Sequence, residues 1–130
     1  MHTRPHFQRG IVVPLDDAAE SVMETGQLDR IASTIYFSFV DDSLFLLVSR
    51  SGLFGDLNRA CGTQIEDSRN ECITSEKLDA AITATRDLIE IVIDDDTRWI
   101  LEQILGVFAD AKRLGKSAHF IFKDNFRIPS

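Results

Sequence analysis

Two consecutive segments with helical periodicity, residues 74–92 and 94–114, constrain the fold of this chain more than any other feature. In the first segment, Thr74 or Ser75 can cap a helix, and apolar residues then recur at three- and four-residue spacing. These apolar positions are Leu78, Ala81, Ile82, Leu88, Ile89 and Val92. We therefore expect a helix with one face buried against the rest of the protein.

The second segment carries helix signals at both of its ends. It begins at three aspartates, 94–96, which suit the positive end of a helix dipole, and Lys112 and Arg113 occupy its last turn. Gly115 follows, and glycine commonly ends a helix. The apolar positions are Ile100, Leu101, Ile104, Leu105, Phe108, Ala111 and Leu114. This pattern predicts a second long helix directly after the first.

Three other segments have the composition of β-strands. Residues 34–40 are β-branched and aromatic with apolar side chains on one face, and residues 118–123 alternate between two faces. Residues 8–13 are a shorter candidate that ends at Pro14. Because strands occur early and late with helices between them, the pattern favours an α+β fold over a regular βαβ array.

The apolar run at residues 44–48 has two interpretations. If Asp41 and Asp42 form a turn, this run is a second strand that pairs with residues 34–40 in a hairpin, which is the interpretation we favour. A helix that begins at Ser43 is the alternative, since periodicity cannot separate helix from strand over so few residues.

Two shorter helices complete the prediction. Asp16 and Asp17 stand where N-cap and first-turn acids belong, before a helix that Gly26 weakens or breaks. A second short helix between residues 52 and 62 directs Leu53, Leu57 and Cys61 inward. Gly62 is suited to end that helix in the left-handed conformation.

The length of 130 residues is that of one ordinary domain. We expect residues 1–130 to form a single α+β domain, with an antiparallel or mixed sheet packed against the two main helices. The longest apolar run, Leu44 to Val48, is far shorter than the roughly 18 residues of a membrane span. The N-terminus lacks the apolar core of a signal peptide. The sequence therefore predicts a cytoplasmic protein that does not contact a membrane.

The charge of the chain is negative and unevenly distributed. The net charge is −7, and residues 14–110 hold 20 acids and 7 bases, whereas residues 111–130 hold 5 bases and 1 acid. An acidic body repels phosphate backbones, so we expect no nucleic-acid ligand. Electrostatics favour a basic protein partner instead.

No group of residues predicts an active site, a metal site or a cofactor site. His2, His6 and His119 are few and separated, and neither Cys61 nor Cys72 belongs to a C-x-x-C pair. No candidate nucleophile has a base and an orienting group at a recognisable spacing. We expect a protein without catalysis, metal or cofactor, in which both thiols are small, mostly buried side chains.

Acidic clusters and the single tryptophan are the best candidates for contact with a partner. The dense acidic clusters also suit turns and helix caps, so a structural role is the alternative for each of them. A partly exposed tryptophan beside an arginine has the character of an interface anchor, although it can also close the edge of a core. The candidate partner-binding residues are Asp41, Asp42, Asp94, Asp95, Asp96, Arg98 and Trp99.

Residues 52–78 carry a resemblance to a class of known proteins. The residues concerned are Gly52-Leu53-Phe54, Leu57-Asn58, Gly62, Ile65, Glu66-Asp67, Glu71, Ile73 and Lys77-Leu78. They resemble patterns in bacterial immunity proteins, which neutralise the toxins of contact-dependent growth inhibition and other polymorphic toxin systems. The resemblance, which covers about a fifth of the chain, implies a small cytoplasmic antitoxin that occludes the active site of a toxin domain. An acidic body suits that role, because charge complementarity speeds the encounter with a basic toxin.

Two other functions are compatible with the sequence. An acidic secretion chaperone has a similar size and charge, usually dimerises, and offers apolar grooves to an unfolded segment of an effector. A small enzyme or ligand-binding domain with an unrecognised site is the third possibility, and a deep polar pocket would favour it.

Overall fold

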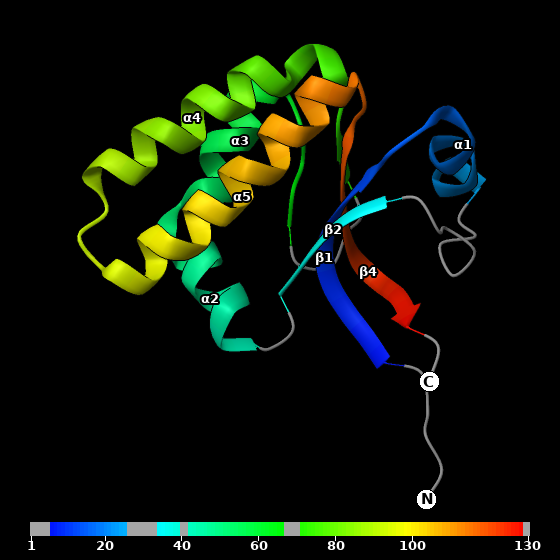
Figure 1. The fold of residues 1–130 in the computed structure, drawn as a ribbon. Coiled ribbons are helices and arrows are strands. Elements are labelled where there is room, and N and C mark those ends of the chain that lie inside the picture. The colour runs from blue at the N-terminus through cyan, green and yellow to red at the C-terminus, as the bar shows by residue number, and fades with distance from the viewer. Residues whose placement is uncertain (1–5, 26–33, 40–41, 67–70, 129–130) are drawn as a thin grey trace, which may run out of the picture.

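The computed structural model describes residues 6–25, 34–39, 42–66 and 71–128, and Figure 1 shows their arrangement. It contains helices that alternate irregularly with strands, so the predicted α+β class is confirmed. In chain order the elements are β1 (His6–Pro14), α1 (Asp17–Thr25), β2 (Thr34–Phe39), α2 (Asp42–Ser51), α3 (Leu53–Cys61), β3 (Glu71–Ile73), the 3-10 turn η2 (Ser75–Lys77), α4 (Leu78–Ile91), α5 (Asp95–Leu114) and β4 (Ala118–Ile128).

The four strands form one antiparallel sheet in the order β2-β1-β4-β3. The first strand of the chain therefore lies between β2 and the last strand, a pairing that no local sequence signal specifies. The register between β1 and β4 shifts between Gln8 and Gly10. The short strand β3 closes the other edge and pairs Cys72 with His119.

Helices α2 to α5 cover one face of this sheet, and α1 lies on the opposite face (Figure 1). Helix α5 packs on the sheet, whereas α4 packs mainly against α3 and α5. The core between the layers holds the fully buried Ile11 and Phe120 from the sheet and Leu57, Ile104 and Phe108 from the helices. Burial of apolar side chains of this size is the main favourable term in folding.

Helix α1 packs against the opposite face of the sheet through fewer contacts than the other helices make with one another. Ala19 is buried there, and the Asp16 carboxylate accepts a hydrogen bond from the Ala19 amide at 2.8 Å, which confirms the predicted cap. The Lys116 side chain, only 12% exposed, pairs with Asp17 and lies 3.8 Å from Glu20. The pKa of Asp17 is lowered by the hydrogen bond from Lys116 and by its positive charge. The predicted helix interruption at Gly26 lies outside the described residues.

The strand and hairpin predicted around residues 44–48 are wrong, because this segment is part of helix α2 and β2 pairs with β1. Phe45 and Val48, three residues apart, are buried, while Leu46 between them is 44% exposed. The ring of Phe45 stands edge-on to that of Phe122 in β4, with centroids 5.3 Å apart. The alternative prediction, a helix that begins at Ser43, agrees with the structure, in which α2 begins at Asp42.

The two main helices follow the prediction closely. Helix α5 ends at Gly115, whose φ of 69° is in the left-handed region and whose amide bonds to the carbonyls of the last turn. Gly62 ends α3 with the same φ value, as expected. Thr74 precedes the 3-10 turn that leads into α4, but its side chain makes no capping hydrogen bond. Helix α4 therefore starts without the predicted cap.

Candidate partner-binding surface

The connection between α4 and α5 is short and well defined. Val92, at the end of α4, has ψ of 130° and so leaves the helical path, and Asp94 has an extended backbone before α5 begins at Asp95. The Val92 amide still donates to the carbonyl of Leu88 at 3.1 Å. Ile93 is thus the one residue between the two helix caps. The turn lies at the end of the helical layer remote from α1 (Figure 1).

Asp94 is the N-cap that the sequence predicted. Its carboxylate accepts hydrogen bonds from the amide of Thr97 at 2.8 Å and from the hydroxyl of Thr97 at 2.7 Å. These two bonds stabilise the ionised carboxylate, so they lower the pKa of Asp94. Asp94 therefore has a structural role that limits its freedom to contact a partner.

Arg98 also holds the turn together. Its guanidinium donates to the carbonyl of Val92, which would otherwise be one of the unsatisfied groups at the end of α4. The same side chain lies 3.3 Å from the carboxylate of Asp95. Arg98 thus connects the first turn of α5 to the end of α4, and it acts as a brace within the protein.

Large apolar side chains are exposed around this turn. Ile91 is 74% exposed, Ile93 91% and Trp99 52%. Of the described side chains, only two other large apolar residues are exposed, Leu15 and Leu46. Single exposed apolar residues are ordinary on protein surfaces, but here three lie within nine residues of chain.

Acidic residues lie next to these apolar residues along the chain. Glu90 at the end of α4 and the first residues of α5 are exposed, and helical spacing places Trp99 on the same side of α5 as Asp95 and Asp96. We define the turn surface as Glu90, Ile91, Ile93, Asp94, Asp95, Asp96 and Trp99. It combines exposed apolar residues with a local excess of negative charge.

The predicted site residues are only partly brought together. The aspartate triplet, Arg98 and Trp99 lie at one turn, but Asp42 is the first residue of α2 and Asp41 lies outside the described residues. Ile91 and Ile93 were missed. For Ile93, the available signal was its position between the two expected helices, because a residue outside a helix no longer follows the apolar stripe, whereas Ile91 is the last residue of α4.

The residues considered for chemistry lie elsewhere. Cys61 is buried in the core and Cys72 is half-buried in β3, and no disulfide joins them. Burial raises the pKa of the Cys61 thiol, while the charge of Lys77 acts in the opposite direction. Cys61 is therefore a protonated core side chain at neutral pH.

The described residues include neither a metal-binding group nor a membrane-spanning helix. Within the part of the chain that the structure describes, no three His, Cys, Asp or Glu side chains are grouped so that they could hold a metal ion. None of the helices among those residues has both the length and the apolar character needed to cross a membrane.

Comparison with known proteins adds no relative. No family model, curated protein or solved structure matches the chain. The resemblance to immunity proteins therefore stays a prediction.

Proposed function

We propose that this protein binds a basic protein domain and neutralises it by covering its active site, in the manner of an immunity protein. One observation carries the proposal: Ile91, Ile93 and Trp99 are exposed together at an acidic turn of a well-packed fold. A surface of this kind has the apolar centre and charged surroundings of a protein interface.

Trp99 is the residue from which most binding energy is expected. A tryptophan that becomes buried in a partner removes a large apolar area from water, and tryptophan is enriched among interface hot spots. Ile91 and Ile93 extend the apolar area on the α4 side of the turn. Because Arg98 and Asp94 fix the turn, little conformational entropy is lost when a partner binds.

The charges around the turn favour a basic partner. Glu90, Asp95 and Asp96 are exposed, and the protein as a whole carries a net charge of −7. Charges at the edge of an interface mainly steer the encounter and exclude partners of like charge. A positively charged active-site cleft, such as that of a nuclease toxin, fits this distribution.

The location of the exposed apolar residues favours this function over a secretion chaperone. A chaperone needs an apolar groove along which an unfolded segment can lie. The hollows on either side of α4 are lined by charged, threonine and alanine residues together with Ile82, whereas three of the five exposed large apolar side chains among the described residues lie at the turn. An exposed apolar turn suits insertion into a folded partner.

Affinity purification from the cells that naturally produce the protein tests the proposal. The tagged wild-type chain is compared with a double variant, Ile93→Ser with Trp99→Ala, and with Leu46→Ser as the matched control. Leu46 is similarly exposed, at 44%, but lies on α2. A basic protein retained by the wild type and by Leu46→Ser, but lost from the double variant, is the expected result.

The recovered protein is then assayed for toxicity or enzymatic activity with and without the wild-type chain. Inhibition that disappears with the double variant supports an immunity role. A partner that is retained equally by all three chains contradicts the assignment of the turn surface. Recovery of an unfolded secreted substrate, with no inhibition of any activity, would favour the chaperone.

A further inference from the structure

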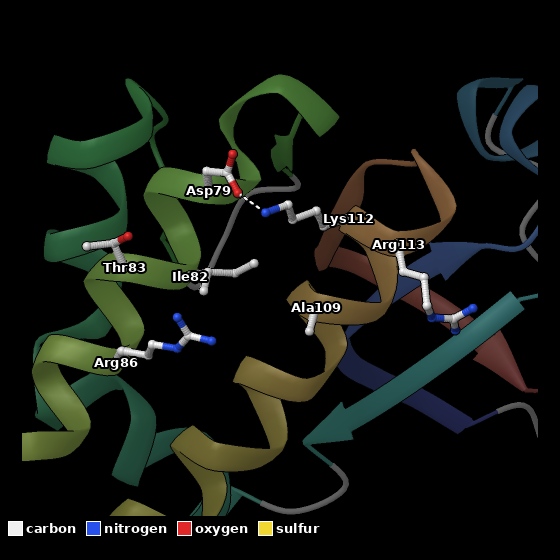
Figure 2. A pocket seen from close by; sticks show the side chains of 7 residues that line it. All are labelled: Asp79, Ile82, Thr83, Arg86, Ala109, Lys112 and Arg113. Atoms are coloured by element: carbon white, nitrogen blue, oxygen red, sulfur yellow. Dashed lines mark ion pairs between the residues drawn. The ribbon is translucent and has the colours of Figure 1, made fainter.

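A hollow of about 520 Å³ lies between α4 and α5. Figure 2 shows the residues that line it. Its volume is within the range of small-molecule sites in proteins. Ile82 and Ala109 form an apolar part of its wall, and Thr83, Arg86, Asp79 and Lys112 contribute polar groups. The small side chain of Ala109 leaves the space between the helices open.

Arg86 is the one cation of this hollow without an ion-pair partner among the described residues. Lys112 is paired with Asp79, and Arg113, on the rim, lies 3.4 Å from Asp110. Figure 2 shows the guanidinium of Arg86 between the two helices, while Arg113 extends away from α4. Glu90, one helical turn after Arg86, forms no ion pair with it.

The positive charge is specific to this side of α4. A second hollow of about 530 Å³ lies on the other side, against α3. Its lining, which consists entirely of described residues, includes the acids Asp79 and Asp87 and no base. The protein has a net charge of −7, so the positive charge of Arg86 in this hollow is opposite to the average charge of the protein. General surface electrostatics would repel an anion, so binding there depends on the local groups.

We propose that the hollow between α4 and α5 binds a small organic oxyanion, which Arg86 holds through its guanidinium. The planar guanidinium presents paired N–H donors that match the oxygens of a carboxylate or a phosphate. Ile82 and Ala109 contact the apolar body of the ligand. The inference is independent of the turn surface and of the proposed function.

Titration of the full chain with three probes tests the inference. The probes are phenyl phosphate, benzoate and inorganic phosphate, and binding is followed by amide chemical shifts in NMR spectra and by calorimetry. The first variant, Arg86→Gln, removes the charge. The second, Ala109→Leu, fills the hollow and leaves every charge in place, and leucine suits this exposed helical position. The control is Arg50→Gln, which removes an exposed arginine of α2.

Phenyl phosphate or benzoate should bind, with shifts centred on residues 79–86 and 109–113. Arg86→Gln should weaken binding by roughly tenfold or more, as expected for the loss of a hydrogen bond to a charged group. Ala109→Leu should also weaken binding, because the larger side chain occupies the space of the ligand, and Arg50→Gln should have no effect. A preference between the two aromatic probes identifies the acid group.

Several results would overturn the inference. One is the absence of specific shifts with all three probes. Another is equal weakening by Arg86→Gln and Arg50→Gln, which would indicate diffuse attraction to surface charge. If inorganic phosphate binds as tightly as phenyl phosphate, the apolar wall contributes nothing to binding. If Ala109→Leu leaves the affinity unchanged, the probe binds outside the hollow.

Discussion

Asp94 shows how one side chain serves the fold at a place where the sequence suggested a partner contact. Its carboxylate accepts both hydrogen bonds that Thr97 can donate from its amide and hydroxyl groups. Asp96, two residues later, is exposed, and it makes no hydrogen bond or ion pair with another described residue. Two aspartates of the same triplet thus have different roles, and only the three-dimensional contacts distinguish them.

The capping role of Asp94 has a testable dependence on pH. The bonds from Thr97 hold the pKa of Asp94 below its ordinary value of 3.8. The stabilisation is therefore fully present above that value and is lost as the pH falls through the lower pKa of the folded state. We expect Asp94→Ala to lower the melting temperature at pH 7 and the difference from the wild type to shrink in acid. Melting curves followed by circular dichroism, at pH 7 and in acid, measure this difference in melting temperature. Asp96→Ala is the control for the loss of an acid that caps nothing.

If Asp94→Ala and Asp96→Ala lower the melting temperature equally at neutral pH, the acids act through the helix dipole alone and the cap contributes nothing. A difference that persists undiminished in acid would show that ionisation of Asp94 is not involved.

Buried residues on the two main helices should dominate stability. Leu88 is 6% exposed and Ile104 is fully buried. Truncation of either to alanine should reduce the free energy of unfolding by about 2–5 kcal/mol, from lost burial and from the cavity that remains. Ile93, 91% exposed, provides the matched control, and Ile93→Ala should change stability by less than about 0.5 kcal/mol. Urea unfolding measures the free energy of unfolding of all three variants. If Ile93→Ala lowers it as much as Ile104→Ala does, Ile93 is packed against another part of the chain.

At the scale of elements, the sequence predicted best where several signals agreed. Helix α5 has an acidic start, a periodic apolar face, basic residues in its last turn and a terminal glycine, and all of these features are found in the structure. Residues 44–48 had only an apolar run of five residues. In the structure these residues are helical, and Phe45 contacts Phe122, a residue that is distant in the sequence. A local pattern cannot contain that information.

The same limit explains what was and was not predicted about the turn surface. Trp99 and the aspartate triplet were visible as unusual residues next to a helix start. The exposure of Ile93 is related to where α4 ends, at the extended backbone of Val92, whose carbonyl accepts the hydrogen bond from Arg98. Helix boundaries are the least reliable part of a sequence-based prediction, because end residues satisfy their hydrogen bonds through side chains.

Two glycines, one inside helix α5 and one directly after it, should have opposite effects on stability when they are replaced by alanine. Gly106 lies in the helix interior, and a Cβ atom there would meet nothing within 4 Å, so Gly106→Ala should stabilise the protein by about 0.5–1 kcal/mol. Gly115 has φ of 69°, and Gly115→Ala should destabilise it by about 1–2 kcal/mol, because a side chain disfavours the left-handed conformation. Denaturant unfolding of both variants is the measurement. A stabilising effect of Gly115→Ala would show that α5 continues beyond Leu114.

On the scale of the whole molecule, the sheet and the turn surface are separated by the length of the helical layer. The sheet joins β1 near the start of the chain to β4 near its end, and α5 runs from the turn surface back to β4. The turn residues contribute little to the core, because their side chains are exposed. Substitutions there should therefore alter partner binding without unfolding the protein. This separation allows a kinetic test of the electrostatic part of the proposed function.

The last prediction concerns the rate at which the partner binds. Glu90 and Asp96 are the turn acids without a structural hydrogen bond among the described residues, so reversing both to lysine leaves the Asp94 cap and the contact between Asp95 and Arg98 in place. Because such charges mainly steer the encounter, association with the basic partner should slow by about tenfold or more at low salt and become less dependent on salt. Dissociation should change little, whereas Trp99→Ala should accelerate it, since a buried anchor mainly sets the lifetime of a complex.

The matched control reverses Glu66 and Glu76, which are exposed and precede α4. It changes the net charge equally, but α4 alone, with 14 residues, separates Glu76 from the turn by about 20 Å. Surface-plasmon measurements at low and high salt, each beside a melting curve, compare the two charge variants. If both slow association equally, the partner senses only the total charge and the turn surface is not the interface. If only the variant at Glu90 and Asp96 does so, the acids of this turn direct the partner onto Trp99.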